Sequence, residues 1–501
     1  MPQQISPLPS RLYSGAQSRR FDSIAIDEHG IPGIVLMKRA GQAAFDALCS
    51  TWPGTARITV LCGKGNNAGD GYIIAGLAGN QGMDVQLVQL GATSQLQGDA
   101  GLARDWAIDQ GIVAIEIDAD APEFVVEGDV IVDALLGTGL SGDVRPGYAQ
   151  AVALVNADAA PVLAVDVPSG VCADTGRVLG TAVRADLTVT FIGVKQGLCT
   201  GAAIEYVGGV RYADLDVPEA VFAGERGIEV LDWPSLRRAL GERAGNAYKN
   251  SFGHVLIVGG DVGMGGAVAL AGEAALRCGA GLVSIVTRPE HVAPVLARRP
   301  ELMVVGTDTP ARVEECLARA DVVAVGPGLG RGAWGQRLLE RVFETGKPCV
   351  IDADALNLMA QAGLDIPDAS VLTPHPGEAA RLLGSDNQTV QADRLGAARD
   401  LAARYQATVV LKGAGTLITE PDGAAGICLL GNPGMATAGM GDVLTGIIAG
   451  LSGRMSVREA ARVGTCLHSA AADRVVASRG ERGLIAADVV EALVAELNAE
   501  S

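Results

Sequence analysis

The strongest constraint on the fold is a regular alternation of short apolar runs, glycine turns and helix-length segments along the chain. Short apolar runs are typical of strands buried on both faces of a sheet, and strands that alternate with helices form parallel sheets. The sequence therefore predicts an α/β fold in which ligands gather at the carboxyl ends of the strands. Buried strands are expected at residues 58–62, 130–136, 162–165, 187–192, 255–258, 283–286, 322–325, 350–351 and 408–411.

The length of the chain, 501 residues, exceeds what one hydrophobic core supports and indicates two domains of roughly 200–280 residues. Residues 213–232 are rich in acidic residues, glycine and proline, and they lack a strong helical period, as expected of a linker. We therefore predict one domain at residues 1–224 and a second at residues 225–501. The two halves share no visible motif, which favours a fusion of unlike domains over a duplication.

The net charge is −18, from 39 basic and 57 acidic residues, and no basic stripe interrupts the acidic excess. Such a chain is a poor candidate for nucleic-acid binding, so anionic ligands are expected to bind backbone N–H groups at helix N-termini. Nine scattered cysteines without a Cys-x-x-Cys pair indicate reduced thiols. Neither a signal-peptide core nor an apolar stretch of about 18 residues is visible. We expect a soluble, cytoplasmic homo-oligomer with no nucleic-acid or membrane partner.

A glycine-rich loop follows the first predicted strand. It reads Gly63-Lys64-Gly65-Asn66-Asn67-Ala68-Gly69-Asp70-Gly71 and leads into a helix-like segment at residues 72–79. A strand, a glycine-rich turn and a helix N-terminus together form an anion site. An ordinary tight turn is the alternative, but so long a run of glycine and polar residues favours a ligand loop. The loop matches neither Gly-x-Gly-x-x-Gly nor the Walker A pattern, because no Lys-Ser/Thr follows its last glycine.

Two aspartates lie near the ends of later strands in this half. Asp133 precedes the turn Gly137-Thr138-Gly139, and Asp166 precedes Val167-Pro168-Ser169-Gly170. Taken singly, each could be a helix N-cap or a turn residue. Two carboxylates that face one crevice instead favour a functional role, either cation binding or proton transfer.

The most informative segment of the second half is Asn432-Pro433-Gly434-Met435-Ala436-Thr437-Ala438-Gly439-Met440-Gly441-Asp442, followed by an apolar helix at residues 443–451. Backbone N–H groups at the positive end of that helix would surround a phosphoryl group. Asp442 in the first turn could then take a proton from an attacking hydroxyl. A helix cap alone would not need the two glycines that precede it.

Three further segments support a nucleotide site in this half. A glycine hairpin at residues 411–416 is suited to gripping phosphates or ribose, although a plain turn is the alternative. Residues 326–330, Gly-Pro-Gly-Leu-Gly, follow a strand and either allow a close backbone approach to a ligand or form a structural turn alone. Residues 373–378 present His375, the only histidine of five in a strongly shaped context. No histidine, cysteine and carboxylate set has zinc spacing.

The first-half motifs resemble the epimerase domain of NAD(P)H-hydrate repair proteins, and Met37-Lys38-Arg39-Ala40-Gly41 resembles the N-terminal helix signature of that family. The resemblance implies a Rossmann-like three-layer domain that holds a potassium ion with Asn67, Asp133 and Ser169, with Asp166 as the acid/base. Lys38 and Ala68 stand where the family has Glu and Gly. The residues implied to contact the hydrated dinucleotide are Asn66, Asn67, Ala68, Gly69, Asp70, Gly137, Thr138, Gly139, Leu140, Ser141, Gly142, Asp143 and Asp166.

The run Gly439-x-Gly441-Asp442 resembles the signature of the ribokinase-like superfamily, and the full second-half set resembles ADP-dependent NAD(P)H-hydrate dehydratase. Asn250 and Met440 stand where Gly and Thr are expected. The resemblance implies a ribokinase-like α/β domain that uses ADP and a magnesium ion, with Asp442 catalytic. Ala267, Gly328, His375 and Asp442 are implied to contact the hydrate, and Lys412, Gly413, Ala414, Gly415, Thr416 and Gly441 to contact ADP.

Together the two resemblances imply a bifunctional repair enzyme for hydrated NADH and NADPH. One domain would interconvert the R and S hydrates, and the other would dehydrate the S hydrate to NAD(P)H with release of AMP and phosphate. Two alternatives stay open at this point. The second domain could be a ribokinase-like small-molecule kinase with an unrelated partner, and the first could be a nucleotide-binding or scaffold domain.

Overall fold

The computed structural model describes residues 8–241, 245–246, 248–308 and 312–499. The chain forms two compact units that divide between Ile228 and Glu229, whereas the sequence places the boundary between residues 224 and 225. Within the described ranges, every helix is too short or too polar to span a bilayer. The nine cysteines all lie in those ranges and are free and buried or half-buried.

The N-terminal unit is built on one sheet with the order β4-β3-β2-β5-β6-β7-β8, in which every neighbouring pair is parallel. A short strand, β1 (Arg11–Leu12), precedes α1 (Gly15–Asp27). The sheet strands are β2 (Arg57–Cys62), β3 (Asp84–Leu90), β4 (Ala114–Ile117), β5 (Val130–Ala134), β6 (Val162–Val165), β7 (Leu187–Phe191) and β8 (Gly209–Ala213). The remaining helices are α2 (Gly33–Thr51), α3 (Asn66–Asn80), α4 (Gly98–Asp109) and α5 (Pro146–Ala157).

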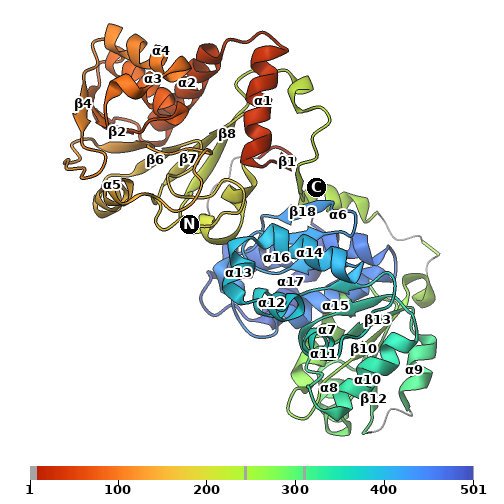
Figure 1. The fold of residues 1–501 in the computed structure, drawn as a ribbon. Helices are drawn as coiled ribbons and strands as arrows, with labels where there is room; N and C mark the ends of the chain where they lie inside the picture. The colour runs from red at the N-terminus through yellow and green to blue at the C-terminus, as the bar shows by residue number, and fades with distance from the viewer. Residues whose placement is uncertain (1–7, 242–244, 247, 309–311, 500–501) are drawn as a thin grey trace. The chain divides into compact units, whose positions relative to one another are not determined.

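Helices cover both faces of this sheet, because alternate residues of each buried strand point to opposite sides. Val60 belongs to the core beneath α2, α3 and α4, whereas its neighbour Leu61 belongs to the core beneath α5. Figure 1 shows α2, α3 and α4 on one face of the sheet and α5 on the other. The predicted three-layer α/β arrangement is confirmed.

The order of the strands places a crevice between β2 and β5. From β2 the chain adds β3 and then β4 toward one edge of the sheet. It then returns to the other side of β2 and adds β5, β6, β7 and β8 toward the opposite edge. The loops that leave the carboxyl ends of β2 and β5 therefore diverge. Ligands of doubly wound sheets bind at such a switch point.

The C-terminal unit has a second sheet with the order β9-β18-β17-β16-β15-β14-β13-β10-β11-β12. Its strands are parallel except in the meander β16-β17-β18. They span β9 (Ile228–Val230), β10 (His254–Val258), β11 (Leu282–Thr287), β12 (Met303–Gly306), β13 (Val322–Val325), β14 (Cys349–Ile351), β15 (Val371–Leu372), β16 (Thr408–Leu411), β17 (Thr416–Thr419) and β18 (Ala425–Cys428). Its switch point lies between β10 and β13.

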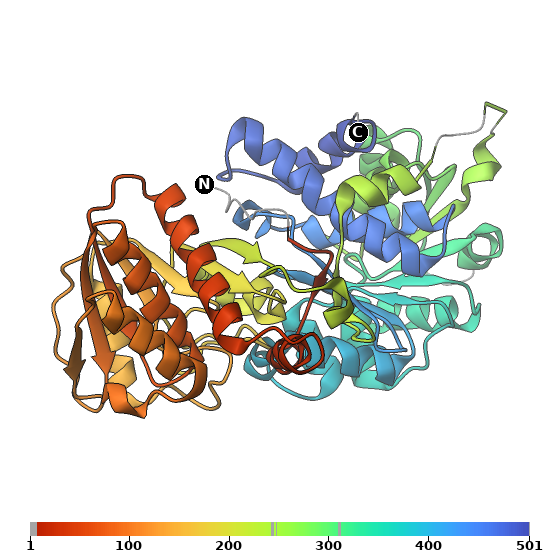
Figure 2. The ribbon, with the colours of Figure 1, turned by 90° about the horizontal axis from the view of Figure 1, so that it is seen from above.

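Helices again cover both faces of the sheet, and Figure 2 shows the blue C-terminal helices on one side of the strands and the cyan helices on the other. The blue set is α15 (Met440–Ser452), α16 (Val457–Arg479) and α17 (Ala486–Leu497), which pack with α7 (Gly265–Arg277). The others are α6 (Trp233–Ala239), α8 (Val292–Arg298), α9 (Val313–Arg319), α10 (Ala333–Glu344), α11 (Ala353–Ala362), α12 (Pro376–Leu383), α13 (Asn387–Ala392) and α14 (Arg394–Tyr405).

Glycines fix the distance between α15 and α7. A Cβ on Gly446 would lie 2.1 Å from the carbonyl oxygen of Ala271, and a Cβ on Gly450 would lie 2.7 Å from that of Ala275. Only glycine allows two helix backbones to come this close. The seam holds α15 in place, and the N-terminus of α15 carries Asp442.

Candidate active sites

A cavity of about 620 Å³ opens at the switch point of the N-terminal sheet, between the loops that follow β2 and β5. It lies where the carboxyl ends of the parallel strands expose backbone and polar side chains. The structure brings together in its wall ten of the residues that the sequence predicts for the hydrate: Asn66, Asn67, Asp70, Gly137, Thr138, Gly139, Leu140, Ser141, Asp143 and Asp166.

Three predicted contacts lie outside this wall. Ala68 is fully buried in the core of the N-terminal unit, so its methyl group points away from the cavity. Gly69 packs against Met37, where a Cβ would lie 2.4 Å from the sulfur. Gly142 lies in the loop with a φ of 77°. Since Ala68 faces the core, its replacement of the family's glycine leaves the loop free to approach a ligand.

Oxygen atoms converge beside the cavity, around Asp133. The carboxylate of Asp133 is fully buried and accepts hydrogen bonds from the Ser169 hydroxyl, at 2.6 Å, and from the Ser169 N–H, at 2.8 Å. The side-chain amide of Asn67 donates to the carbonyl of Leu136, whose oxygen lies 3.2 Å from Ser169 Oγ. Burial raises the pKa of Asp133 to about 6, with the hydrogen bonds from Ser169 opposing the rise. The partners of this carboxylate are thus neutral groups.

Asp166 directly follows β6 and adopts a left-handed backbone with a φ of 66°. Such conformations are uncommon outside glycine and gather at functional sites. Its Oδ1 accepts hydrogen bonds from Thr190 Oγ1 at 3.1 Å, from the backbone N–H of Phe191 at 3.3 Å and from the ammonium of Lys195. Lys195 is 3% exposed and also donates to the carbonyl of Phe191. The carboxylate is therefore an acceptor held by a buried cation.

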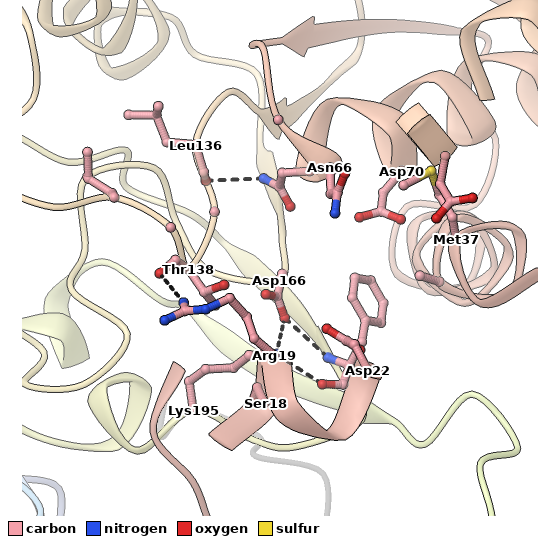
Figure 3. Close-up of a pocket in the computed structure, with 18 of the residues that line it drawn as sticks. Ser18, Arg19, Asp22, Met37, Asn66, Asp70, Leu136, Thr138, Asp166 and Lys195 are labelled. Carbon is pink, nitrogen blue, oxygen red and sulfur yellow. Dashed lines mark hydrogen bonds and ion pairs between the residues drawn. The ribbon is translucent and has the colours of Figure 1, made fainter. Parts of the chain in front are cut away.

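Two further carboxyl groups face the same cavity. Figure 3 shows Asp22, Asp70 and Asp166 projecting into it from three different elements. Burial, followed by the negative charges of Asp166 and Asp22, holds the pKa of Asp70 well above its usual value. Desolvation by the pocket wall raises the pKa of Asp22 to about 6, while the ammonium of Lys195 opposes the rise. Asp22 and Asp70 therefore both favour the protonated form more strongly than a carboxyl group in water does.

A second cavity, of about 440 Å³, lies at the switch point of the C-terminal sheet. Four residues that the sequence predicts for the hydrate meet in its wall: Ala267, Gly328, His375 and Asp442. Gly328 has a φ of 55°, and a Cβ there would lie 2.7 Å from that of Met264, so only glycine fits between the two loops. The wall also contains Arg331, Asp354, Asn357, Glu378 and Arg381.

Asp442 occupies the first turn of α15, after Gly439 in a left-handed conformation with a φ of 87°. The N-terminal N–H groups of the helix point toward the same end and favour anions there. Burial raises the pKa of Asp442 to about 7, the charge of Asp352 adds to the rise, and Lys412 opposes it. A carboxyl group that titrates near neutral pH is suited to act as a general base.

Lys412 lies beside this cavity and pairs with two carboxylates. Its Nζ lies 2.8 Å from Asp352 Oδ1 and 3.9 Å from Glu378 Oε2, and Thr445 donates to the other oxygen of Asp352. Burial acts to lower the pKa of Lys412, but the carboxylates of Asp352 and Glu378 hold it above its usual value. Burial raises the pKa of Glu378 to about 7 against the pull of Lys412.

Each half of the chain contains one of these cavities, and each half matches a different family of known proteins. Residues 255–494 match the family model described as NAD(P)H-hydrate dehydratase, and residues 33–197 match that described as YjeF-related protein N-terminus. The chain is 48% identical to the bifunctional NAD(P)H-hydrate repair enzyme Nnr of Coxiella burnetii, over 95% of this chain and 97% of the relative. It is 42% identical to the protein of the same name from Escherichia coli, over 98% and 95%. This chain belongs to the bifunctional NAD(P)H-hydrate repair enzymes.

The fold of the second half of the repair enzyme also has a solved counterpart. A ribokinase-like superfamily protein from Enterococcus faecalis is 31% identical to it, with a TM-score of 0.51, and the match covers 54% of this chain and 95% of that protein. The predicted ribokinase-like architecture is confirmed.

The predicted ADP contacts of the repair enzyme lie beside the second cavity rather than in its described wall. Residues 412–416 join β16 to β17 as the expected glycine hairpin. A Cβ on Gly441 would lie 3.3 Å from Lys412 Nζ, so the hairpin and the helix N-terminus meet. Gly413, with a φ of 138°, lies over the guanidinium of Arg394, which donates to the carbonyls of Leu411 and Lys412.

Sequence reasoning missed several charged residues of the repair enzyme. Lys195, Asp22 and Arg19 line the first cavity but stand in no glycine-rich motif, and Arg19 donates to the carbonyl of Thr138. Asp352 follows the predicted strand at residues 350–351, and this position was a usable signal. Across the described residues, no group of three or more His, Cys, Asp or Glu side chains is arranged to hold a metal ion.

Proposed function

We propose that the N-terminal domain interconverts the R and S hydrates of NADH and NADPH, and that the C-terminal domain dehydrates the S hydrate with ADP, releasing AMP and phosphate. The observation that supports this most is Asp442, which titrates near pH 7 at a helix N-terminus beside Ala267, Gly328 and His375. A base next to N–H groups that favour a phosphoryl group fits the activation of a hydroxyl by phosphorylation.

In the proposed dehydration, Asp442 takes the proton of the C6 hydroxyl while the hydroxyl oxygen attacks the terminal phosphoryl group of ADP. The bond to AMP breaks, and a phosphate ester forms at C6. The lone pair of the ring nitrogen then expels phosphate, and loss of a proton from C5 restores the double bond. Hydroxide is a poor leaving group and phosphate a good one, so the nucleotide drives the elimination.

The nucleotide would lie against the hairpin at residues 412–416 and Gly441. Because Lys412 already pairs with Asp352 and Glu378, we infer that its ammonium balances the carboxylates beneath the phosphates. ADP is proposed as the phosphoryl donor from the family resemblance. A magnesium ion would reach the site on the nucleotide's phosphates, since Mg²⁺ commonly binds through substrate phosphates together with few carboxylates.

The oxygen cluster beside the first cavity fits a potassium ion. A buried carboxylate with neutral partners lacks a counter-charge, and hydroxyl, amide and carbonyl oxygens are ligands that hard cations accept. Asp133, Ser169 and Asn67 would hold the ion. A bound cation there would supply the missing positive charge and stiffen the loop after β5, which forms one wall of the cavity.

The epimerase domain would allow the dehydratase to repair both hydrate epimers. If the dehydration site accepts one configuration at C6, the other hydrate accumulates unless the two are interconverted. Joining both domains in one chain provides both activities in equal amounts. A cytoplasmic location and a homo-oligomeric state stay predictions, which cell fractionation and light scattering would test.

The decisive assay supplies the whole chain with each separated hydrate epimer and either ADP or ATP, and follows the return of nicotinamide absorbance. We expect the S hydrate to recover at once with ADP and the R hydrate to recover after a lag. A stable phosphorylated product without recovered nicotinamide would instead identify a small-molecule kinase. Recovery from the S hydrate alone would leave the first domain as a binding or scaffold unit.

A further inference from the structure

The first cavity contains a buried ion pair that the sequence did not predict. Lys195 lies between η2 (Gln196–Cys199) and β7, and its ammonium contacts Asp166 Oδ1 while donating to the Phe191 carbonyl at 2.9 Å. Both residues line the cavity, with side chains 3% and 16% exposed. A buried lysine tied to a backbone carbonyl cannot swing freely, so it fixes the direction in which Asp166 presents its other oxygen.

Asp70 faces this pair from the opposite wall. It lies in the second turn of α3, the helix that follows the loop after β2. Met37 and Ala40 of α2 line the cavity beside it. Burial and the nearby charges of Asp166 and Asp22 favour its protonated form. The cavity therefore presents Asp166, paired with a buried ammonium, on one side and a carboxyl group that favours its protonated form on the other.

Other charged groups also face this region. Asp22 and Arg19 extend from α1, Asp99 from α4, and Lys64 from the loop after β2. Arg19 donates to the Thr138 carbonyl, which directs its charge toward the loop after β5. Lys195 is the cation with a described ion pair to Asp166.

We propose that Asp166 and Asp70 are the base and the acid of hydrate epimerisation and that Lys195 is the positioning residue for Asp166. The inference rests on the proposed epimerase function and assigns its chemistry. The sequence implied only that Asp70 contacts the substrate, whereas the proposal makes it a proton donor. Lys195 had no assigned role before.

The reaction balances as a ring opening and closure. Asp166 takes the proton of the C6 hydroxyl, the oxygen electrons form a C6 carbonyl, and the C6–N1 bond breaks. Its electron pair goes to N1, which receives a proton from Asp70, so the open form is a neutral aldehyde. After rotation about the C5–C6 bond, N1 attacks the other face of the aldehyde. Asp70 recovers its proton from N1, and Asp166 returns a proton to the oxygen.

A carboxylate in the site argues against the alternative route, in which the hydroxyl leaves as water. That route gives a C6–N1 iminium ion, and the adjacent carboxylate would remove its C5 proton and form NAD(P)H directly. Repair would then need no nucleotide. Ring opening passes through an uncharged species whose C5 protons are less acidic than those of an iminium ion, so it preserves the hydrate while inverting C6.

Variants of the whole chain test the assignment, with epimerisation of the separated hydrates as the readout. We expect Asp166→Asn and Asp70→Asn each to lower kcat for epimerisation by roughly 10²–10⁴-fold, with little change in KM. Lys195→Met should lower kcat by roughly tenfold or more with little change in KM, because a carboxylate that has lost its tether no longer points steadily at the substrate. Lys195→Arg should restore much of the lost kcat.

Matched controls come from the same domain. Asp109 and Lys38 are exposed residues on α4 and α2 outside the cavity wall, so Asp109→Asn and Lys38→Met should epimerise at the wild-type rate. In every variant, ADP-dependent recovery of the S hydrate reports whether the C-terminal domain still works, and circular dichroism reports folding. Asp70→Asn at the wild-type rate would overturn its acid role. A folded Lys195→Met at the wild-type kcat, or a Lys195→Arg that restores none of the lost kcat, would overturn the positioning role.

Solvent labelled with oxygen-18 separates the two routes. Ring opening retains the substrate oxygen, so mass spectrometry should find unlabelled hydrate after one turnover. One labelled oxygen per inversion would overturn ring opening in favour of water loss. If the wild-type chain does not interconvert the epimers at all, the proposed epimerase function fails instead, and that result is distinct from any variant failing alone.

Discussion

Gly446 on α15 lies directly against the backbone of Ala271 on α7, so closely that a Cβ would come within 2.1 Å of the Ala271 carbonyl oxygen. The contact fixes α15 about one turn after Asp442, the residue that we propose as the base of dehydration. Packing in the core of this domain and the position of Asp442 are therefore linked.

Replacing Gly446 with alanine should separate α15 from α7, because a backbone carbonyl cannot move aside as a flexible side chain can. We expect the free energy of unfolding of the C-terminal domain to fall by roughly 1–3 kcal/mol, with a lower kcat for dehydration. Denaturant titration and the recovery assay measure the two effects. Gly332→Ala is the matched control, since a Cβ there meets nothing within 4 Å. An unchanged Gly446→Ala enzyme would contradict the link.

Asp442→Asn should reduce dehydration by roughly 10²–10⁴-fold, because an amide cannot accept the hydroxyl proton. In the unmodified enzyme, the pKa of about 7 for Asp442 means that the active, ionised form accumulates as pH rises. kcat/KM for dehydration should therefore fall as pH falls through about 7. A pH profile that is flat from pH 6 to pH 8 would exclude Asp442 as the base, and epimerisation in the variant provides the internal control.

Lys412→Met should destabilise the second site, because Asp352, whose side chain is 2% exposed, would lose its buried counter-charge. Breaking one side of a buried pair typically costs roughly 3–5 kcal/mol. Thermal unfolding measures this loss. The acidic limb of the dehydration profile should also move to higher pH, because Lys412 holds down the pKa of Asp442. Lys347→Met on the C-terminal domain is the comparison, since the Lys347 ammonium contacts backbone carbonyls rather than a carboxylate.

Potassium should stabilise the N-terminal domain in a pH-dependent way. The pKa of Asp133 is about 6 in the folded chain, above its ordinary value, so the unfolded state ionises first and stability falls as pH rises between about 4 and 6. A bound cation would offset that loss above pH 6. We expect potassium chloride to raise Tm relative to choline chloride at pH 7.5 but not at pH 4.5. Asp133→Asn should remove the difference; equal Tm values in both salts at pH 7.5 would exclude the site.

The parallel architecture was predictable because buried strands are apolar along their whole length. All nine expected strands are present, although the run at residues 130–136 leaves the sheet after Ala134 to form the cavity wall. Strand β3 was not expected, since Gln86 and Gln89 interrupt its apolar run. Both are buried and hydrogen-bonded, Gln86 to Thr59 and Gln89 to the carbonyl of Gly63. A sequence pattern does not reveal such partners.

The candidate sites were predictable where glycine and aspartate follow a strand, as at Asp166 and Asp442. They were not predictable where a long side chain reaches the site from elsewhere. Lys195 comes from a segment without a ligand motif, and only the fold brings it to Asp166. The elevated pKa of Asp70 likewise depends on burial and on charges from other elements. The ligands themselves, including potassium and ADP, stay predictions that rest on the family resemblance.

In each sheet the order of strand addition reverses at a switch point, between β2 and β5 in one and between β10 and β13 in the other. Each cavity lies where the loops diverge at that point. The strands beneath carry the stability of each domain, whereas the loops carry its chemistry. Substitutions that alter substrate preference can therefore accumulate in the loops at one edge without disturbing the core. The opposite edge, at the amino ends of the strands, is correspondingly the place to insert a tag or a reporter domain into a working enzyme.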